Sequence, residues 1–325
     1  MLIPHFWAEA RAHHDDGKRE ATVRRFGWSN SSQEDAQQHA EIRANAALEN
    51  VLRGQQLPPR DPRVPYNGAA GLPIREEILG EYGDVVLTRN SYGATCLNTP
   101  DVLFIDVDHP DRPEAGWING VMGVMLGGAV LGAFLLESPA LLLPFALIAL
   151  IVSYPVARRL ARAWHHLQGG QDQILLERIK HFVGKHPEWN LVVYQTPGGI
   201  RLLATHRTFQ PLEPDVDLCF RELGADHVYA LMCKNQQCFR ARLSPKPWRI
   251  GLTDHLRPRP GVWPVKESYR EIRKNWIDRY TAASEGYASC RFVTTLGSGI
   301  VHLKVSAVQQ LHDEMSRARS GLPIA

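Results

Sequence analysis

The chain has 325 residues, of which 44% are hydrophobic and 22% are charged, and its formal net charge is +3 at pH 7. So small a net charge does not by itself indicate a nucleic-acid partner. The cysteines number five, which argues against a framework of paired disulfides. The length allows one medium-sized domain with additional segments.

The amino-terminal segment, residues 1–56, is polar and is expected to form a helical arm. Ser31 or Ser32 can cap a helix whose first turn is acidic, and alanine-rich sequence continues to about Leu52. A proline-rich linker follows and opens the first part of the main domain, residues 57–115.

Two short apolar segments, residues 84–89 and 102–107, predict strands in this first part. The second strand ends in Asp106 and Asp108, which lie on one face because side chains alternate along a strand. Two carboxylates placed in this way can share a divalent cation, and oxygen ligands favour Mg²⁺ or Mn²⁺. The alternative is a strand end with two solvated aspartates.

Residues 116–157 are expected to form a transmembrane helical hairpin. Neither 117–136 nor 140–156 contains a charged residue, and each is close to the length that crosses a hydrocarbon core. The basic residues that flank them are Arg112, Arg158, Arg159 and Arg162. This charge bias predicts a multi-pass protein of the cytoplasmic (inner) membrane with both termini cytoplasmic. A pair of buried core helices is the alternative.

The first apolar stretch carries glycines at helical spacing, which let two helices approach closely. They are Gly116, Gly120, Gly123, Gly127, Gly128 and Gly132. Their partner is either the second stretch of the hairpin or another copy of the chain, which would make a homo-oligomer.

The sequence after the hairpin contains segments typical of helices and segments typical of strands. Helices are predicted at 171–186, 212–223, 266–285 and 306–319, and strands at 191–195, 200–205, 228–232 and 239–243. This order indicates an α+β fold with a mixed or antiparallel sheet and flanking helices. The domain resumes over 158–265, and a helical region, 266–325, ends the chain. Because neither flank has enough strands to bury a face, 84–108 and 191–250 are expected to form one sheet.

Two segments of the second part carry candidate nucleotide or phosphate ligands. A tight turn from Thr196 to Gly199 leads into a strand with Arg201. A basic strand and a proline-stiffened loop then supply Arg240, Arg242, Lys246 and Arg249. Cations on a rigid loop near paired carboxylates suit a nucleoside triphosphate or a nucleic-acid backbone. A solvated basic loop, or attraction to anionic lipid head groups, is the alternative.

Cys233 and Cys238 are candidate zinc ligands, with His227 just upstream. A zinc site would need a further ligand, for which Cys219 and His206 are the candidates. Ordinary buried thiols are the alternative.

The order of FIDVD, YQTPGGIRLL and RARLSPKPWR resembles the catalytic core of the archaeo-eukaryotic primase superfamily. The similarity covers residues 84–250. It implies that Asp106 and Asp108 are metal ligands and that Thr196, Gly199 and Arg201 lie on the nucleotide-binding turn, with Arg201 where the family has histidine. The family's later acidic ligand would be one of Asp215, Asp217 and Asp226.

Three functions remain open from the sequence, and it does not decide whether the protein is an enzyme. The first is a membrane-anchored, metal-dependent nucleotide-binding or nucleotidyl-transfer protein. The second is a non-enzymatic membrane protein whose cytoplasmic domain binds a partner. The third is a membrane-bound glycosyltransferase, although only about 105 residues precede Asp106, where such an enzyme needs a nucleotide-binding half.

Overall fold

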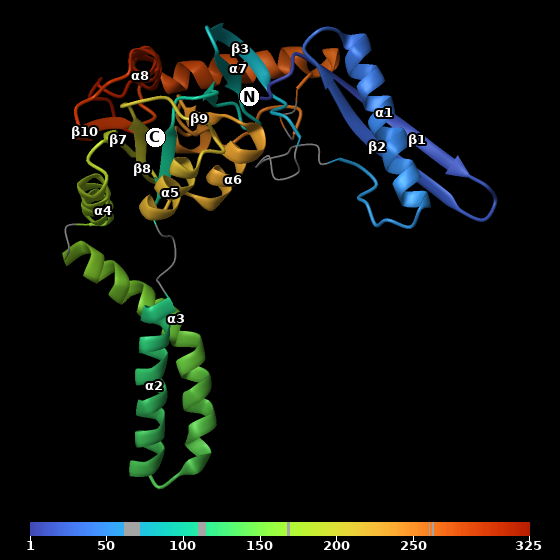
Figure 1. Ribbon diagram of the computed structural model, residues 1–325. Helices are drawn as coiled ribbons and strands as arrows, with labels where there is room; N and C mark the ends of the chain where they lie inside the picture. Colours follow the sequence, from blue (N-terminus) through green and yellow to red (C-terminus); the bar gives the residue numbers. More distant parts are fainter. Residues whose placement is uncertain (62–71, 110–114, 168–169, 260, 262) are drawn as a thin grey trace.

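The computed structural model describes the chain except for residues 62–71, 110–114, 168–169, 260 and 262. It has a central α+β body, an amino-terminal β-hairpin with one helix at its side, and a long helical hairpin that projects away from the body (Figure 1). Arg112 and the side chain of Arg162, two of the predicted flanking cations, lie outside the described residues.

Two four-stranded antiparallel sheets form the body. One has the order β10-β7-β8-β6 and the other β3-β4-β5-β9. The strands of the first are β6 (Phe104–Asp108), β7 (Asn190–Thr196), β8 (Gly199–Ala204) and β10 (Arg291–Gly297). Those of the second are β3 (Glu77–Tyr82), β4 (Val85–Arg89), β5 (Thr95–Thr99) and β9 (Phe239–Arg242).

The expected single sheet is therefore two sheets, and each is assembled from both sides of the helical hairpin. Strand β6 pairs with β8, and strand β5 pairs with β9. The sequence signals for β3, β5 and β10 were too weak to predict them. Without β3 and β5, the second sheet has too few strands to be recognised.

The first sheet is buried on both faces because alternate residues of its strands enter two different cores. Leu191, Val193 and Leu202 pack against the helices on one face. Val192 and Leu203 pack on the other face, against the second sheet and the last helix. The helices of the first face are α4 (Gln171–Lys185), α5 (Pro214–Leu223) and α6 (His227–Gln236), and the last helix is α8 (Leu303–Ser316).

Most predicted helices after the hairpin are confirmed, including α7 (Arg270–Ser284), which follows a short 3₁₀ turn. The strand predicted at 228–232 is wrong, since these residues belong to α6. Asp226 accepts a hydrogen bond from the backbone N–H of Tyr229 and so caps this helix at 2.6 Å. Residues 228–232 therefore form part of a capped helix, although their short apolar run had suggested a strand.

The prediction of a wholly helical arm over 1–56 is wrong for its first half. That half forms β1 (Phe6–Asp15) and β2 (Glu20–Ser29), and only α1 (Gln33–Leu52) is helical, with the predicted cap at Ser32. Alternate alanines of β1 lie against alanines of α1. At Gly27 a Cβ atom would lie 2.1 Å from the backbone nitrogen of Ala40, so this close packing requires glycine.

The two apolar stretches form helices α2 (Ala115–Leu135) and α3 (Leu142–Leu167), which pack side by side as a hairpin (Figure 1). Their length and composition are sufficient to cross a membrane. The hairpin exposes large apolar side chains such as Val124 (77% exposed) and Phe134 (78%). A Cβ added at Gly116, Gly120, Gly123, Gly127 or Gly128 would meet no atom within 4 Å, so these glycines do not serve the packing between α2 and α3.

Candidate functional site

A cavity of about 260 Å³ lies where β6, the β7–β8 turn, β9 and α6 meet. This volume is slightly below the usual range for small-molecule sites, about 300–1,000 Å³. Among the described residues, the charged side chains that line the cavity are Arg75, Glu76, Asp106, Asp108, Arg201, Asp226, Arg240, Arg242, Lys246 and Arg249. Six are basic and four are acidic, so the lining has an excess of positive charge.

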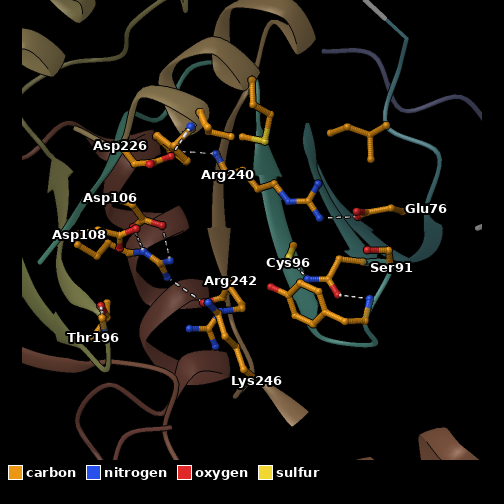
Figure 2. A pocket seen from close by; sticks show the side chains of 18 of the residues that line it. Glu76, Ser91, Cys96, Asp106, Asp108, Thr196, Asp226, Arg240, Arg242 and Lys246 are labelled. Carbon is orange, nitrogen blue, oxygen red and sulfur yellow. Dashed lines mark hydrogen bonds and ion pairs between the residues drawn. The ribbon is translucent and has the colours of Figure 1, made fainter. Parts of the chain in front are cut away.

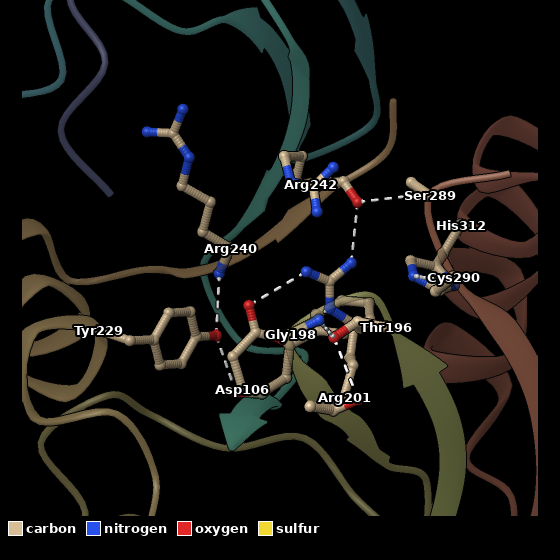
Figure 3. Close-up of polar contacts among 12 residues, drawn as sticks. Asp106, Thr196, Gly198, Arg201, Tyr229, Arg240, Arg242, Ser289, Cys290 and His312 are labelled. Atoms are coloured by element: carbon tan, nitrogen blue, oxygen red, sulfur yellow. Dashed lines mark hydrogen bonds and ion pairs between the residues drawn. The ribbon is translucent and has the colours of Figure 1, made fainter. Parts of the chain in front are cut away.

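Arg201 and Asp106 form an ion pair at the floor of the cavity (Figure 3). Their strands place them directly opposite each other. The Arg201 Nε and Nη2 donate to the two carboxylate oxygens of Asp106 at 2.7 and 3.0 Å, and Nη1 donates to the Arg242 carbonyl at 2.8 Å. Arg201 is only 2% exposed. Burial alone would lower its pKa, but the neighbouring Asp106 carboxylate outweighs burial and raises the pKa above the usual value.

The Thr196–Gly199 turn brings backbone into the cavity wall. The Thr196 hydroxyl donates to the Gly199 carbonyl at 3.1 Å and accepts from the Gly198 N–H at 3.4 Å. The Gly198 carbonyl accepts from the N–H of His109 at 2.8 Å. At Gly199 a Cβ would lie 2.1 Å from the Val107 carbonyl oxygen, so only glycine fits beside β6.

Arg242, Lys246 and Arg249 form a group of cations on the same side of the cavity as this turn; we call it the cation cluster. A Cβ at Gly198 would lie 3.7 Å from both Arg249 Nη2 and Asp108 Oδ1, which places Arg249 against the turn. Burial, then the charge of Arg242, lowers the pKa of both Lys246 and Arg249. None of the three forms an ion pair with a described residue, although Arg242 donates to the Ser244 carbonyl. Mutually repelling cations of this kind suit a bound anion.

The residues present do not fit the two-metal centre that the Asp-x-Asp motif suggests. Both Asp106 oxygens already accept hydrogen bonds from a buried arginine, so a cation of the protein itself neutralises this carboxylate. No group of three His, Cys, Asp or Glu side chains within the described part of the chain converges on one point. Of the later acidic candidates, Asp226 lines the cavity, while Asp215 pairs with Arg207 and Asp217 with Lys234.

The cysteines are buried and unpaired. Cys219 and Cys233 belong to the apolar core between the first sheet and its helices, and burial raises the pKa of both thiols. The same described residues contain no three-ligand cluster around Cys233 and Cys238. Ordinary buried thiols account for this arrangement, and zinc binding stays untested.

The structure brings together almost all of the site residues that the sequence singled out. Asp106, Asp108, Thr196, Arg201, Arg240, Arg242, Lys246 and Arg249 line one cavity, several of them are labelled in Figure 2, and Gly199 follows the lining residue Gly198 in the chain. Arg240 faces away from the cation cluster and pairs with Glu76 at 2.5 Å.

Sequence reasoning missed Glu76, the Asn90–Tyr92 turn and the α6 residues Tyr229, Met232 and Gln236, all of which line the cavity. The sequence NSYG at 90–93 is typical of a turn, and this signal could have predicted both the turn and the strand β5 that follows it. No local pattern marks Gln236 or Glu76, because each reaches the cavity through tertiary packing.

The chain matches no family model, no curated protein and no solved structure. The resemblance to primase cores therefore stays a prediction, and the geometry of the cavity carries the functional argument.

Proposed function

We propose that this protein is anchored in the cytoplasmic membrane and that its cytoplasmic α+β body binds a nucleoside triphosphate. The observation that carries the proposal is the cation cluster, Arg242, Lys246 and Arg249. Its like charges repel one another, and its members form no ion pair with a described residue, although the nearby Asp106 and Asp108 carboxylates partly offset the repulsion. A triphosphate would supply further negative charge, and charge-assisted hydrogen bonds to phosphate are among the strong ones.

The turn beside the cluster favours the same kind of ligand. Gly198 has no side chain between Arg249 and Asp108, so a phosphate oxygen can approach the backbone of the turn. The Asp106–Arg201 pair is neutral overall and does not oppose an anion. The proposal therefore needs no divalent cation, and nucleotidyl transfer, which would need one, is not part of it.

The helical hairpin supports the membrane anchor. Only 11% and 17% of the apolar windows of α2 and α3 are buried, whereas the core helix of a soluble protein would be mostly buried. The pairings β6–β8 and β5–β9 join residues before the hairpin to residues after it, which supports a topology with both flanks on the same side of the membrane. The exposed Arg158 and Arg159 at the base of α3 favour the cytoplasmic side.

Calorimetric titration of the full-length protein in detergent tests the proposal, with inorganic triphosphate and ATP as probes. Lys246→Ala combined with Arg249→Ala removes two charged contacts, each worth about 1.5–3 kcal/mol, so both probes should bind at least about a hundredfold more weakly. The matched control is Arg270→Ala with Lys274→Ala, two exposed cations of α7 that do not line the cavity. No measurable binding of either probe to the wild type would refute the proposal.

A further inference from the structure

An exposed tryptophan stands beside the cation cluster. Trp248 lies in a short 3₁₀ turn, Pro247–Arg249, so Lys246 and Arg249 of the cluster are its near neighbours in the chain. Trp248 is 54% exposed, which leaves much of a large apolar ring in contact with water. The body therefore makes only partial use of this ring for its own packing, and the open part is available to a ligand.

The loop that carries Trp248 is held firmly. Pro245 and Pro247 are both buried, and proline fixes the backbone angle φ. The Tyr280 hydroxyl donates to the Pro245 carbonyl at 2.7 Å, and the N–H of Ile250 donates to the Pro247 carbonyl at 3.1 Å. The ring is thus presented to solvent by a constrained backbone, so little conformational entropy is lost when a ligand contacts it.

Two contacts connect the ring to the cavity. The ring of Tyr92, which lines the cavity, meets the Trp248 ring at its edge, with centroids 5.3 Å apart. The Lys246 ammonium lies 5.6 Å from the centroid of the Trp248 ring, within the range of a cation–π interaction. Trp248 touches these two lining residues without lining the cavity itself, so it lies at the rim. A ligand whose phosphates contact the cation cluster can therefore reach Trp248 with its other end.

Aromatic side chains beside phosphate-binding cations are the means by which many proteins hold nucleobases. Every base has a flat π face, so stacking on an aromatic ring requires no particular hydrogen-bonding edge of the base. A polyphosphate without a base has nothing to place on the ring. The rim thus distinguishes nucleotides from other polyphosphates by their aromatic part.

We infer that Trp248 stacks on the base of the bound nucleoside triphosphate, so that the site selects nucleotides over other polyphosphates and accepts all four bases. This inference rests on the proposed function, which places the triphosphate at the cation cluster. Purines, which have the larger π surface, should bind somewhat more tightly than pyrimidines.

Calorimetry on the full-length protein in detergent compares ATP, GTP, CTP and UTP with inorganic triphosphate. Trp248→Ala should weaken the binding of every nucleotide at least about fivefold, the lower limit for the loss of one base stack. The affinity for inorganic triphosphate should stay unchanged, which also shows that the variant is folded. Trp164→Ala is the matched control, because Trp164 is 50% exposed and lies in α3 outside the cavity lining; it should leave all affinities unchanged.

Tryptophan fluorescence shows whether the base touches the ring. A stacked base quenches indole emission, so ATP should reduce the fluorescence of the wild type, whereas inorganic triphosphate should not. Trp248→Phe keeps a ring for stacking and removes the indole. This variant should bind ATP within about threefold of the wild type and lose the quenching.

The outcomes separate the two claims. If inorganic triphosphate binds, but Trp248→Ala weakens ATP no more than it weakens inorganic triphosphate, the ring does not stack on a base, and the inference is overturned while the proposed function stands. Quenching that persists in Trp248→Phe, or tight binding of only one of the four nucleotides, also overturns it, because the base then lies elsewhere or is recognised by hydrogen bonds. If neither inorganic triphosphate nor any nucleotide binds, the proposed function and the inference fall together.

Discussion

Arg201 and Asp106 lie opposite each other on β8 and β6 and share two hydrogen bonds, of 2.7 and 3.0 Å, although 95 residues separate them in the chain. In the sequence, Asp106 and Asp108 form a crowded pair of like charges. In the fold, a buried guanidinium neutralises one of them. Asp106 is therefore part of the framework of the site, and its loss has consequences for stability.

We expect Asp106→Asn to lower the free energy of unfolding by about 3 kcal/mol, because it leaves Arg201 buried opposite a neutral amide. This value is at the low end for buried pairs, since the Asp106 side chain is 31% exposed. Chemical denaturation of the detergent-solubilised protein measures it. Asp278→Asn breaks the exposed pair with Lys274 and should change stability by less than about 0.5 kcal/mol. Equal stability of Asp106→Asn and wild type would show that the buried pair is not formed.

Binding of inorganic triphosphate should not depend on a divalent cation. The cation cluster provides the positive charge directly, and both Asp106 oxygens are held by Arg201. We expect inorganic triphosphate to bind in EDTA, where no divalent cation is free, and excess Mn²⁺ not to strengthen this binding, because triphosphate that chelates Mn²⁺ carries less negative charge. Thermal melts with Mn²⁺ alone should match those in EDTA. Binding seen only with Mn²⁺, and lost in Asp106→Asn, would restore the metal centre that the motif suggests.

Lys246→Met should stabilise the free protein while it weakens triphosphate binding. Burial and the neighbouring arginines lower the pKa of Lys246, so between that pKa and the ordinary lysine value the unfolded chain binds more protons than the folded one. The free energy of unfolding therefore rises with pH through that window. Lys246 contributes least to it at neutral pH, where the lysine is charged and is destabilised by burial and by the neighbouring arginines. At pH 7 the variant should melt at a higher temperature than the wild type when no ligand is present, and inorganic triphosphate should raise the melting temperature of the wild type more than that of the variant. A variant that melts lower without ligand would contradict the repulsion argument.

Gly198 and Gly199 offer a matched pair of substitutions in the turn. Gly199→Ala places a Cβ 2.1 Å from the Val107 carbonyl oxygen, which must push β6 away from β8. We expect a loss of about 1–3 kcal/mol, the usual cost of forcing an extra carbon into a packed site. Gly198→Ala makes only ordinary contacts, at 3.7 Å, and should change stability far less. Denaturation curves of the two variants that coincide would show that the turn does not approach β6 as described.

Removal of the hairpin should leave a folded, water-soluble protein. The body is held by β6–β8 and β5–β9 pairings that bypass α2 and α3, and the hairpin projects away from it (Figure 1). Replacing residues 117–156 by a flexible linker should therefore give a monomer without detergent, with triphosphate affinity within about twofold of the full-length value, or about 0.4 kcal/mol. Size-exclusion chromatography and calorimetry measure both. An aggregated product would indicate that the hairpin packs on the body and belongs to its core.

Elements with a strong local period were predictable from the sequence. The long apolar runs of α2 and α3 predict helices. Short runs of apolar and β-branched residues that end at turns predict β6, β7 and β8. The cavity residues on these elements were found for the same reason. The amino-terminal strands were missed because alternating alanine and charged residues fit a polar helix as well as a strand. Only packing against the alanines of α1 decides between them.

The sequence by itself determined which charged residues belong to the site, because the Asp-x-Asp strand, the turn and the basic loop are recognised from neighbouring residues. Only the tertiary structure decided which of these charges pair with one another. Strand register, which depends on packing over the whole sheet, placed Arg201 opposite Asp106, so that both carboxylate oxygens accept hydrogen bonds from a buried guanidinium. Helix α6 and the segment before β3 then closed the cavity with Gln236 and Glu76, two polar residues that no local pattern distinguishes from surface residues. A site shared by several distant chain segments exists only once the long-range contacts between them have formed.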